Sequence, residues 1–205
     1  MFSPTATVVY ILVAVLAYVI GSISFSYIFG KKIKGEDIRE KGSGNAGTTN
    51  MLRNYGWGLG LLTLICDILK GVFAALLGLW ISGGALGLYI AAVFAVVGHN
   101  YSCFLKFKGG KGIAATAGVL LVIQPIPTII IFAVCVLIVF ITKVMSIGSL
   151  IGLVSSAVCG FLFMNGDIFH GLAVLIIAIL GIIGHRENIV RLANGTERKL
   201  SLSKK

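Results

Sequence analysis

The chain has 205 residues, of which 58% are hydrophobic and only 12% are charged, and its mean hydropathy is +1.03. A soluble domain is about one quarter charged, so this composition excludes an ordinary water-soluble protein and predicts one integral membrane domain over residues 1–205. The net charge of +10 would suit nucleic acid, anionic lipid or anionic substrates, and the positions of the basic residues must decide among them.

Seven apolar runs divide the chain, against roughly 20 residues for an untilted helical span. No basic residue precedes the first run and no small-residue cleavage site follows it, so we expect a retained helix rather than a signal peptide. The third to fifth runs are short and need tilt, flanking residues or a thinner bilayer. The predicted fold is all-α and polytopic, with transmembrane helices at Val8–Phe29, Leu59–Ile81, Ala85–Val97, Ile113–Ile123, Pro127–Ile141, Ile147–Met164 and Ile168–Ile183.

Lysine and arginine concentrate in the connections that follow the odd-numbered runs. All but one of the 17 basic residues lie there, ending with Lys204 and Lys205. The other connections, Ser82–Gly84, Gln124–Pro127 and Asn165–Asp167, carry none. Because basic residues stay in the cytoplasm, this pattern predicts an N-terminus outside and a cytoplasmic C-terminus, which an even number of spans would not allow.

Few side chains inside the predicted spans are reactive or charged. The four cysteines, most of which lie in these runs, are widely spaced without a Cys-x-x-Cys pair, so we expect packing roles, no disulfide, no metal and no other cofactor. Lys70 lies three residues after Asp67, on the same helix face, where the two charges neutralise each other. This pair is either a structural ion pair or a support behind a functional site.

The first basic connection contains a glycine-rich segment, Gly42–Arg53, with the sequence GSGNAGTTNMLR. Its glycines allow backbone N–H groups to converge, its hydroxyl groups add donors, and Arg53 offers two hydrogen bonds to an oxyanion. A helix that begins near Thr48 would point its positive end at the same anion. A flexible loop is the alternative, but the density of donors favours a phosphate site.

The second basic connection, Gly98–Gly112, places three lysines in a turn bracketed by glycines and indicates another anion site. It is not a Walker A loop, because Lys111 is followed by glycine rather than by Ser or Thr. Lys106 and Lys108 are either substrate contacts or anchors near lipid headgroups, whereas Lys111 is better placed to reach a substrate. A lone histidine such as His99 is more often structural.

The third segment, Gly184–Arg191, follows the last run and is succeeded by Gly195–Glu197. His185 and Asn188 are three residues apart and share a face on a helix. A histidine can accept a proton from a hydroxyl while an amide orients a neighbouring group, so we favour a functional over a structural role for His185.

In order, these segments resemble the motifs GSGNxGxTNxxR, GHxxxxFxxFxGGKG and GHRxNIxR of the bacterial membrane family of acyl-phosphate:glycerol-3-phosphate acyltransferases. The resemblance extends to the Asp-x-x-Lys-Gly of the second run and to the overall length. One departure is visible at Tyr101–Cys103, where the family pattern has a proline.

The resemblance implies a specific reaction at the cytoplasmic face of a bacterial cell membrane. A fatty acyl group passes from acyl phosphate to the 1-hydroxyl of glycerol 3-phosphate, giving lysophosphatidic acid and phosphate. The His-x-x-x-x-Asp motif of the CoA-dependent and carrier-dependent acyltransferases is absent, which favours acyl phosphate as donor. The implied partners are the two substrates, membrane lipid and a soluble enzyme that supplies acyl phosphate.

Each motif receives a role in this hypothesis. Ser43 and Lys111 hold the acyl phosphate while Arg53 fixes glycerol 3-phosphate, although these two assignments can be exchanged. His185 and Asn188 position the attacking hydroxyl and accept its proton, unless the leaving phosphate takes it. The further expected phosphate contacts are Gly44, Asn45, Gly47, Thr48, Gly109, Gly110 and Ser149, which otherwise caps its helix. The residues expected to support the site from behind are Asp67, Lys70, His99 and Glu197.

A transporter of a phosphate-containing solute is the main alternative, because basic loops and charges inside a span can line a pathway. It predicts polar donors on both faces, whereas the outer connections are short and nearly uncharged. A structural or adaptor protein has no need for clustered glycines beside Ser, Arg and Lys. Nucleic-acid binding fits worst, because the basic residues are distributed as expected for the cytoplasmic side of a membrane protein.

Overall fold

The structure is a computed structural model that describes residues 3–200, so Lys204 and Lys205 lie outside the described residues. Within this range the chain is all-helical, as predicted, and contains no strand. The helices are α1 (Pro4–Ser22), α2 (Phe25–Lys34), α3 (Thr48–Ser82), α4 (Ala85–Asn100), α5 (Ile113–Ile123), α6 (Pro125–Thr142), α7 (Met145–Leu162), α8 (Ile168–Gly184) and α9 (Arg186–Ala193), with short 3-10 helices at Ile38–Glu40 and Cys103–Leu105.

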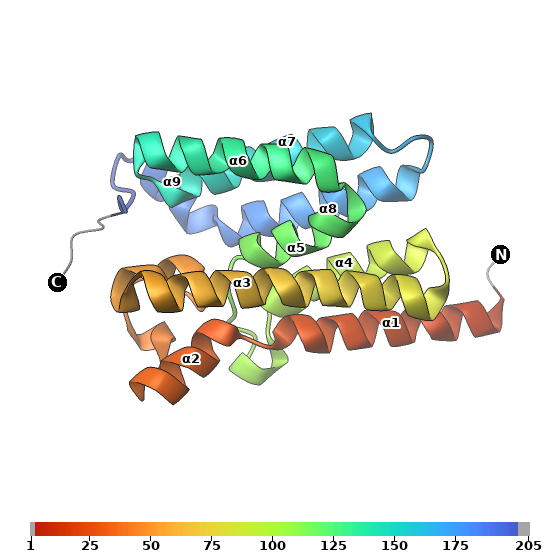
Figure 1. Cartoon of the computed structure of the whole chain (residues 1–205), viewed down its shortest axis with the longest axis horizontal. Helices are drawn as coiled ribbons and strands as arrows, with labels where there is room; N and C mark the ends of the chain where they lie inside the picture. The colour runs from red at the N-terminus through yellow and green to blue at the C-terminus, as the bar shows by residue number, and fades with distance from the viewer. Residues whose placement is uncertain (1–2, 201–205) are drawn as a thin grey trace.

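The long helices lie side by side in two groups (Figure 1). Helices α1, α3 and α4 pack against one another, and α7 packs against both α6 and α8. The short helix α5 lies between the groups and contacts α3 and α6. The core lies where α1, α3, α4, α5 and α8 meet. It contains fully buried alanines that let the helix backbones approach closely, namely Ala75, Ala91, Ala92 and Ala95.

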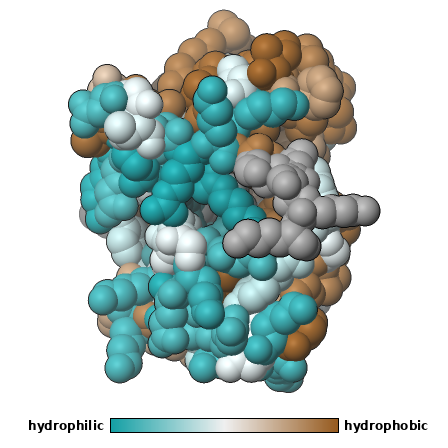
Figure 2. All heavy atoms as spheres, turned by 90° about the vertical axis from the view of Figure 1, so that its left-hand side faces the viewer, coloured by the Kyte–Doolittle hydropathy of each residue, from teal (hydrophilic) through white to brown (hydrophobic). Residues whose placement is uncertain are grey.

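The sides of the bundle are apolar and one of its ends is polar. Large hydrophobic side chains such as Trp80 and Phe140 are 80% and 70% exposed. Figure 2 views the end that carries α2 and α9 and shows hydrophilic residues gathered there; we call this the hydrophilic end. Apolar sides suit contact with lipid, and a polar end suits contact with water and headgroups.

Each predicted apolar run corresponds to helical structure. Within residues 3–200, five helical segments are long and apolar enough to cross a membrane, counting α1 with α2, and α8 taken together with α9 would add a sixth. Helix α5 has 11 residues, about 16 Å of rise. Several spans are therefore present, while the count of seven stays a prediction.

The first predicted run, Val8–Phe29, is divided in the structure, because α1 ends at Ser22 and α2 begins at Phe25. Long-range hydrogen bonds satisfy the carbonyls exposed at this break. The Ser102 hydroxyl donates to the Ser22 carbonyl at 2.6 Å, and Lys70 Nζ donates to the Ile23 carbonyl at 2.5 Å. Ser102 belongs to the tripeptide at which the second motif departs from the family pattern, and here it anchors that loop to α1.

Two glycines show why small residues recur in these helices. A Cβ atom on Gly98 of α4 would lie 2.2 Å from the Tyr18 carbonyl oxygen of α1. One on Gly118 of α5 would lie 2.1 Å from the Ile68 carbonyl oxygen of α3. No side chain fits at either crossing, so these glycines set the separation of helices that flank the first two motifs.

Candidate active site

A cavity of about 400 Å³ lies among α3, α5, α6 and α7 and continues to the loops of the three motifs. Its polar end is lined by Ser43, Asn45, Gly47, Thr48, Arg53, Lys111, Ser146, Ser149, His185, Asn188, Arg191, Glu197 and Arg198. Its apolar end is lined by Leu64, Ala117, Leu120, Ile131, Cys135, Val139, Gly152 and Leu153. We call the apolar end the groove. An anionic head at one end and a hydrocarbon chain at the other would match this lining.

The structure brings most of the predicted site residues together at this cavity. All five predicted catalytic residues line it, as do Asp67, His99 and Glu197 of the predicted supporting set. The predicted residues that do not line it are Gly44, Lys70, Gly109 and Gly110.

The first motif is shaped by Asn50, which sequence reasoning did not single out. Its side chain is 2% exposed, and its amide nitrogen donates to the carbonyls of Ile38, Lys41 and Asn45 at 3.0 Å each. Its amide oxygen accepts from the Ser43 backbone N–H at 3.0 Å. One buried side chain therefore fixes the loop that presents Ser43 to the cavity.

Helix α3 begins at Thr48, well before the predicted run that starts at Leu59, and Gly47 is its N-cap. No side chain caps this end, so its backbone N–H groups and positive dipole end are available near the cavity. Gly44 has a different role from the predicted one. Its φ of +71° and its N–H bond to the Lys41 carbonyl make it a turn residue outside the cavity.

The second motif positions Lys111 through its two preceding glycines. The N–H groups of Gly109 and Gly110 donate to the carbonyls of Asn100 and His99 at 3.1 and 3.0 Å. A Cβ atom on Gly109 would lie 2.0 Å from the His99 carbonyl oxygen. Neither amide is free for a phosphate, so the predicted contacts from this glycine pair are replaced by a packing role that places Lys111 in the cavity.

The third motif lies at a bend of 59° between α8 and α9. His185 is at the bend, 3% exposed, with Nδ1 2.8 Å from the Gly181 carbonyl oxygen. Because a carbonyl only accepts, Nδ1 carries a proton, which leaves Nε2 as the proton acceptor of the neutral ring. Asn188 follows on α9, and its amide oxygen accepts a hydrogen bond from Lys111 Nζ.

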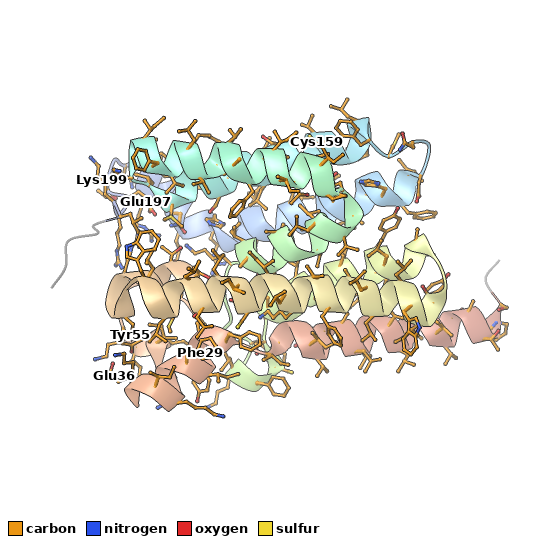
Figure 3. All side chains as sticks on the ribbon, viewed as in Figure 1. Phe29, Glu36, Tyr55, Cys159, Glu197 and Lys199 are labelled. Atoms are coloured by element: carbon orange, nitrogen blue, oxygen red, sulfur yellow. The ribbon has the colours of Figure 1, made fainter. Side chains whose placement is uncertain are left out.

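Glu197 joins three polar side chains at the hydrophilic end (Figure 3). It accepts from Asn188 Nδ2 at 2.7 Å, from Arg191 Nε at 2.8 Å and from the Ser146 hydroxyl at 3.1 Å. Burial raises the pKa of Glu197, but these hydrogen bonds outweigh it and hold the pKa below its usual range. The carboxylate therefore stays ionised and fixes both α9 and the start of α7.

The charges at the polar end are mostly positive. Arg53, Lys111, Arg191 and Arg198 line it together with the carboxylate of Glu197. Burial, followed by the charge of Arg191, lowers the pKa of Lys111 to about 8. Arg53 also donates to the backbone carbonyl of Arg198 at 3.0 Å, which brings the segment after α9 over the site. A dianionic phosphate would relieve the repulsion among these cations.

Behind the polar end lies a buried charged cluster on α3 and α4. Lys70 Nζ is 2.8 Å from Asp67 Oδ1, and the same oxygen is 3.8 Å from His99 Nδ1. His99 supports the second motif directly, because its carbonyl accepts from Gly110 N–H. The cluster thus connects the α1–α2 break, through Lys70, to the loop that carries Lys111.

Ser149 does not cap its helix, because α7 begins four residues earlier and its N-cap is Val144. The Ser149 hydroxyl donates to the Met145 carbonyl at 3.0 Å and lines the cavity. Sequence reasoning did not select Ser146, Arg191 or Arg198 as site residues. Arg191 lay inside the third motif and was the only one of these with a local signal.

Known proteins similar to this chain share one description. Residues 11–195 match the family model described as glycerol-3-phosphate acyltransferase. The chain is 44% identical over 192 residues to a glycerol-3-phosphate acyltransferase of Thermotoga petrophila, covering 93% of this chain and 96% of that protein. It is 42% identical over 200 residues to a glycerol-3-phosphate acyltransferase of Clostridioides difficile, covering 95% and 97% of the two chains.

The fold is similar to that of a membrane protein of known structure. The crystal structure of PlsY (YgiH), an integral membrane glycerol 3-phosphate acyltransferase, in its glycerol 3-phosphate form has a TM-score of 0.86, with 34% identity over 94% of this chain and 96% of that one. Its lysophosphatidic acid form has a TM-score of 0.84 with 33% identity. The matched family model and these relatives show that the chain belongs to the glycerol-3-phosphate acyltransferase family of integral membrane proteins.

Proposed function

We propose that this protein transfers a fatty acyl group from acyl phosphate to the 1-hydroxyl of glycerol 3-phosphate, giving lysophosphatidic acid and phosphate. The observation that carries the proposal is one cavity that joins three cationic motifs to an apolar groove. Both substrates carry a phosphate and one carries a hydrocarbon chain, so the two ends of the cavity match them. The relatives that are named for glycerol 3-phosphate, and for a lysophosphatidic acid form, support the same reaction.

In the proposed reaction the hydroxyl oxygen attacks the acyl carbonyl carbon, and the bond from that carbon to the phosphate oxygen breaks. Lys111, Ser43 and the N-terminus of α3 hold the acyl phosphate, while Arg53 binds the phosphate of glycerol 3-phosphate. The hydroxyl proton passes to Nε2 of His185 or to the leaving phosphate. An acyl phosphate is already activated, so positioning and charge stabilisation suffice without a covalent enzyme intermediate.

The contact network also gives the supporting residues roles in this proposal. Asn188 orients Lys111, and Glu197 orients Asn188. Asp67 and His99 support the second motif from behind. Ser149, Asn45, Gly47 and Thr48 line the polar end and complete the phosphate sites.

Purified protein supplied with a long-chain acyl phosphate tests the reaction. Phosphate release that depends on glycerol 3-phosphate, with lysophosphatidic acid as co-product and no use of acyl-CoA, is the expected result. Well-folded protein that releases no phosphate would contradict the proposal. Uptake of a phosphate-containing solute by liposomes carrying the protein would then favour the transporter alternative.

We further infer seven spans in a bacterial cell membrane, with the N-terminus outside and the hydrophilic end in the cytoplasm. The positions of the basic residues and the polar surface in Figure 2 support this orientation. Cys103 is exposed in the connection after α4 and serves as a native probe. In a variant that retains only Cys103, a membrane-impermeant maleimide should label inverted vesicles but not intact cells. A cysteine-free variant carrying Gly84→Cys, in the α3–α4 connection, should show the opposite pattern.

A further inference from the structure

A second cavity of about 440 Å³ lies beyond the groove, among α6, α7 and the start of α8. Cys159 lines it and lies away from the hydrophilic end, where Glu197 is found (Figure 3). Its lining is mostly apolar and consists of Ile123, Gln124, Pro125, Ile126, Pro127, Ile130, Ile131, Cys159, Phe163 and His170. Ile131 also lines the groove, so this side chain is part of the wall between the two cavities.

The rest of the wall is a buried polar network. Gln124 is 3% exposed, and its amide nitrogen donates to the Ser156 carbonyl at 3.3 Å, while its amide oxygen lies 3.4 Å from His170 Nε2. The Thr128 hydroxyl donates to the Gln124 carbonyl at 2.8 Å. Thr128 and Ser156 face the groove, whereas Gln124 and His170 face the second cavity. The network therefore connects α6, α7 and α8 at the end of the groove.

The distance from the polar end of the cavity to the wall follows from two serines on α7. Ser146 bonds Glu197 at the polar end, and Ser156 bonds Gln124 at the wall. The two serines are ten residues apart on one helix, which corresponds to about 15 Å of rise. An extended carbon chain advances about 1.2 Å per bond, since three backbone bonds span at most about 3.6 Å. The distance from the polar end to the wall therefore corresponds to about a dozen bonds of extended chain.

We propose that the wall formed by Ile131, Thr128, Gln124 and Ser156 is the stop for the distal end of the acyl chain and sets the chain length that the enzyme prefers. The proposal rests on the proposed acyl-transfer function. A chain that pushed past the wall would separate Gln124 from Ser156 and leave buried polar groups without partners, which is unfavourable.

An acyl chain longer than the groove could leave the cavity between α3 and α6. Trp57 and Leu61 on α3 and Phe132 and Val136 on α6 line the cavity and are also exposed on the outside of the bundle, at 61%, 51%, 45% and 53%. A long chain would bend out between α3 and α6 and lose contacts with the groove. The wall therefore favours acyl chains that end in front of it. A smaller side chain in the wall should favour longer acyl chains.

The test is a competition among saturated acyl phosphates that differ by two carbons, mixed in equal amounts in liposomes that contain the full-length protein and saturating glycerol 3-phosphate. The lysophosphatidic acid products are quantified by mass spectrometry. Ile131→Ala joins the two cavities and should raise the ratio of longer to shorter products at least about threefold. Moving one methylene group from water into an apolar site would change the ratio roughly fourfold. The expected change is smaller because the end of the chain would otherwise lie in lipid, which is also apolar.

Two further variants make the test specific. Ala117→Leu fills the groove from α5 and should shift the ratio toward shorter products, in the opposite direction to Ile131→Ala. Ile129→Ala is the matched control on α6, because Ile129 is 59% exposed and lines neither cavity. It should leave the ratio unchanged.

The outcomes separate this inference from the function on which it rests. Active Ile131→Ala and Ala117→Leu proteins with the wild-type product ratio would overturn the wall as the determinant of length. If Ile131→Ala does not fold, Ala117→Leu alone decides. An active Ala117→Leu protein with the wild-type product ratio would also overturn the wall as the determinant of length. Wild-type protein that makes no product from any chain length would instead contradict the acyl-transfer function.

Discussion

Glu197 accepts a hydrogen bond from the side-chain amide nitrogen of Asn188 at 2.7 Å, and this contact determines which way the amide faces. With its nitrogen bound to the carboxylate, Asn188 presents its oxygen to Lys111. A residue from the segment after α9 thereby orients, through one intermediary, the cation that we assign to the acyl phosphate. The segment after α9 that contains Glu197 is thus part of the candidate active site.

Replacing Glu197 by glutamine should impair the reaction without unfolding the protein. The variant loses the closer of the two acidic partners of Arg191 and allows the Asn188 amide to turn. A hydrogen bond to a charged group contributes about 1.5–3 kcal/mol, so kcat/KM should fall about tenfold or more. Glu187→Gln is the matched control, because Glu187 lies 3.8 Å from the same arginine, with its side chain 74% exposed. Equal activities of the two variants would argue against the orienting role of Glu197.

His185→Ala distinguishes the two routes for the hydroxyl proton. If Nε2 of His185 accepts the proton, kcat should fall by at least about a hundredfold, in the range of general base catalysis, while glycerol 3-phosphate still binds. Isothermal titration of the purified variant with glycerol 3-phosphate measures binding separately from turnover. A loss of only a few-fold would assign the proton to the leaving phosphate.

Activity should fall as the pH rises through about 8. Lys111 has a pKa of about 8 because burial and the nearby Arg191 disfavour its charged form. The ammonium is present below that pH and lost above it, so the interaction with the acyl phosphate is lost in the same direction. A pH profile of kcat/KM measures this effect.

Two lysine variants identify the group responsible for that profile. Lys111→Arg remains charged at high pH, so its profile should lack the decline above pH 8, although its activity is lower at every pH. Lys108→Ala, at an exposed lysine of the same loop, should retain the wild-type profile. A decline that persists in Lys111→Arg would mean that another group titrates.

Asp67→Asn should destabilise the protein strongly. It leaves Lys70 charged and buried without its partner at 2.8 Å, and breaking a buried pair in this way costs about 3–5 kcal/mol. Thermal unfolding of detergent-solubilised protein, followed by tryptophan fluorescence, measures the loss. The double variant Asp67→Leu, Lys70→Met removes both charges and should recover most of the stability.

The activity of that double variant decides the role of the pair. Because His99 and Asp67 support the loop that carries Lys111, a stable double variant with reduced kcat would indicate a supporting role behind the site. Full activity would make the pair structural only. A single Asp67→Asn variant as stable as wild type would contradict the ion-pair description itself.

Gly118→Ala should be destabilising although alanine is the better helix former. Its Cβ atom would meet the Ile68 carbonyl oxygen of α3, and overpacking of this kind costs about 1–3 kcal/mol. Gly58→Ala on α3 is the control, because a Cβ atom there meets nothing within 4 Å. The control should be neutral or slightly stabilising in the same thermal assay. Equal unfolding temperatures would show that α3 and α5 can move apart without cost.

The sequence predicted best where a local pattern has one physical meaning. The all-helical fold followed from the apolar runs, whereas the start of α3 at Thr48 lies before the run predicted from Leu59, because the polar first turns of α3 carry no apolar signal. The break between Ser22 and Phe25 was not predictable, because the apolar run continues through it. Its stabilising partners, Lys70 and Ser102, are 47 and 80 residues away from the carbonyls that they bind.

Ambiguous chemistry explains the other differences. The Gly109–Gly110 pair looks like a phosphate cradle in the sequence, but glycine serves equally where two backbones approach closely, and here that is its role. The hydroxyl of Ser146 gave no signal of its own, because its importance comes from Glu197, 51 residues later. The Gln124 wall was likewise invisible, since its partners come from two other helices.

The exposed side chains of Trp57 and Phe132, which border the cavity on α3 and α6, have a kinetic consequence. Under the proposed function, one substrate arrives from three-dimensional solution and the other by diffusion in a two-dimensional sheet. The rate should then depend on the mole fraction of acyl phosphate in that sheet rather than on its amount per volume. Inert phospholipid added at constant protein and constant acyl phosphate would slow turnover. Dilution with buffer would change the rate only because it lowers the concentration of glycerol 3-phosphate.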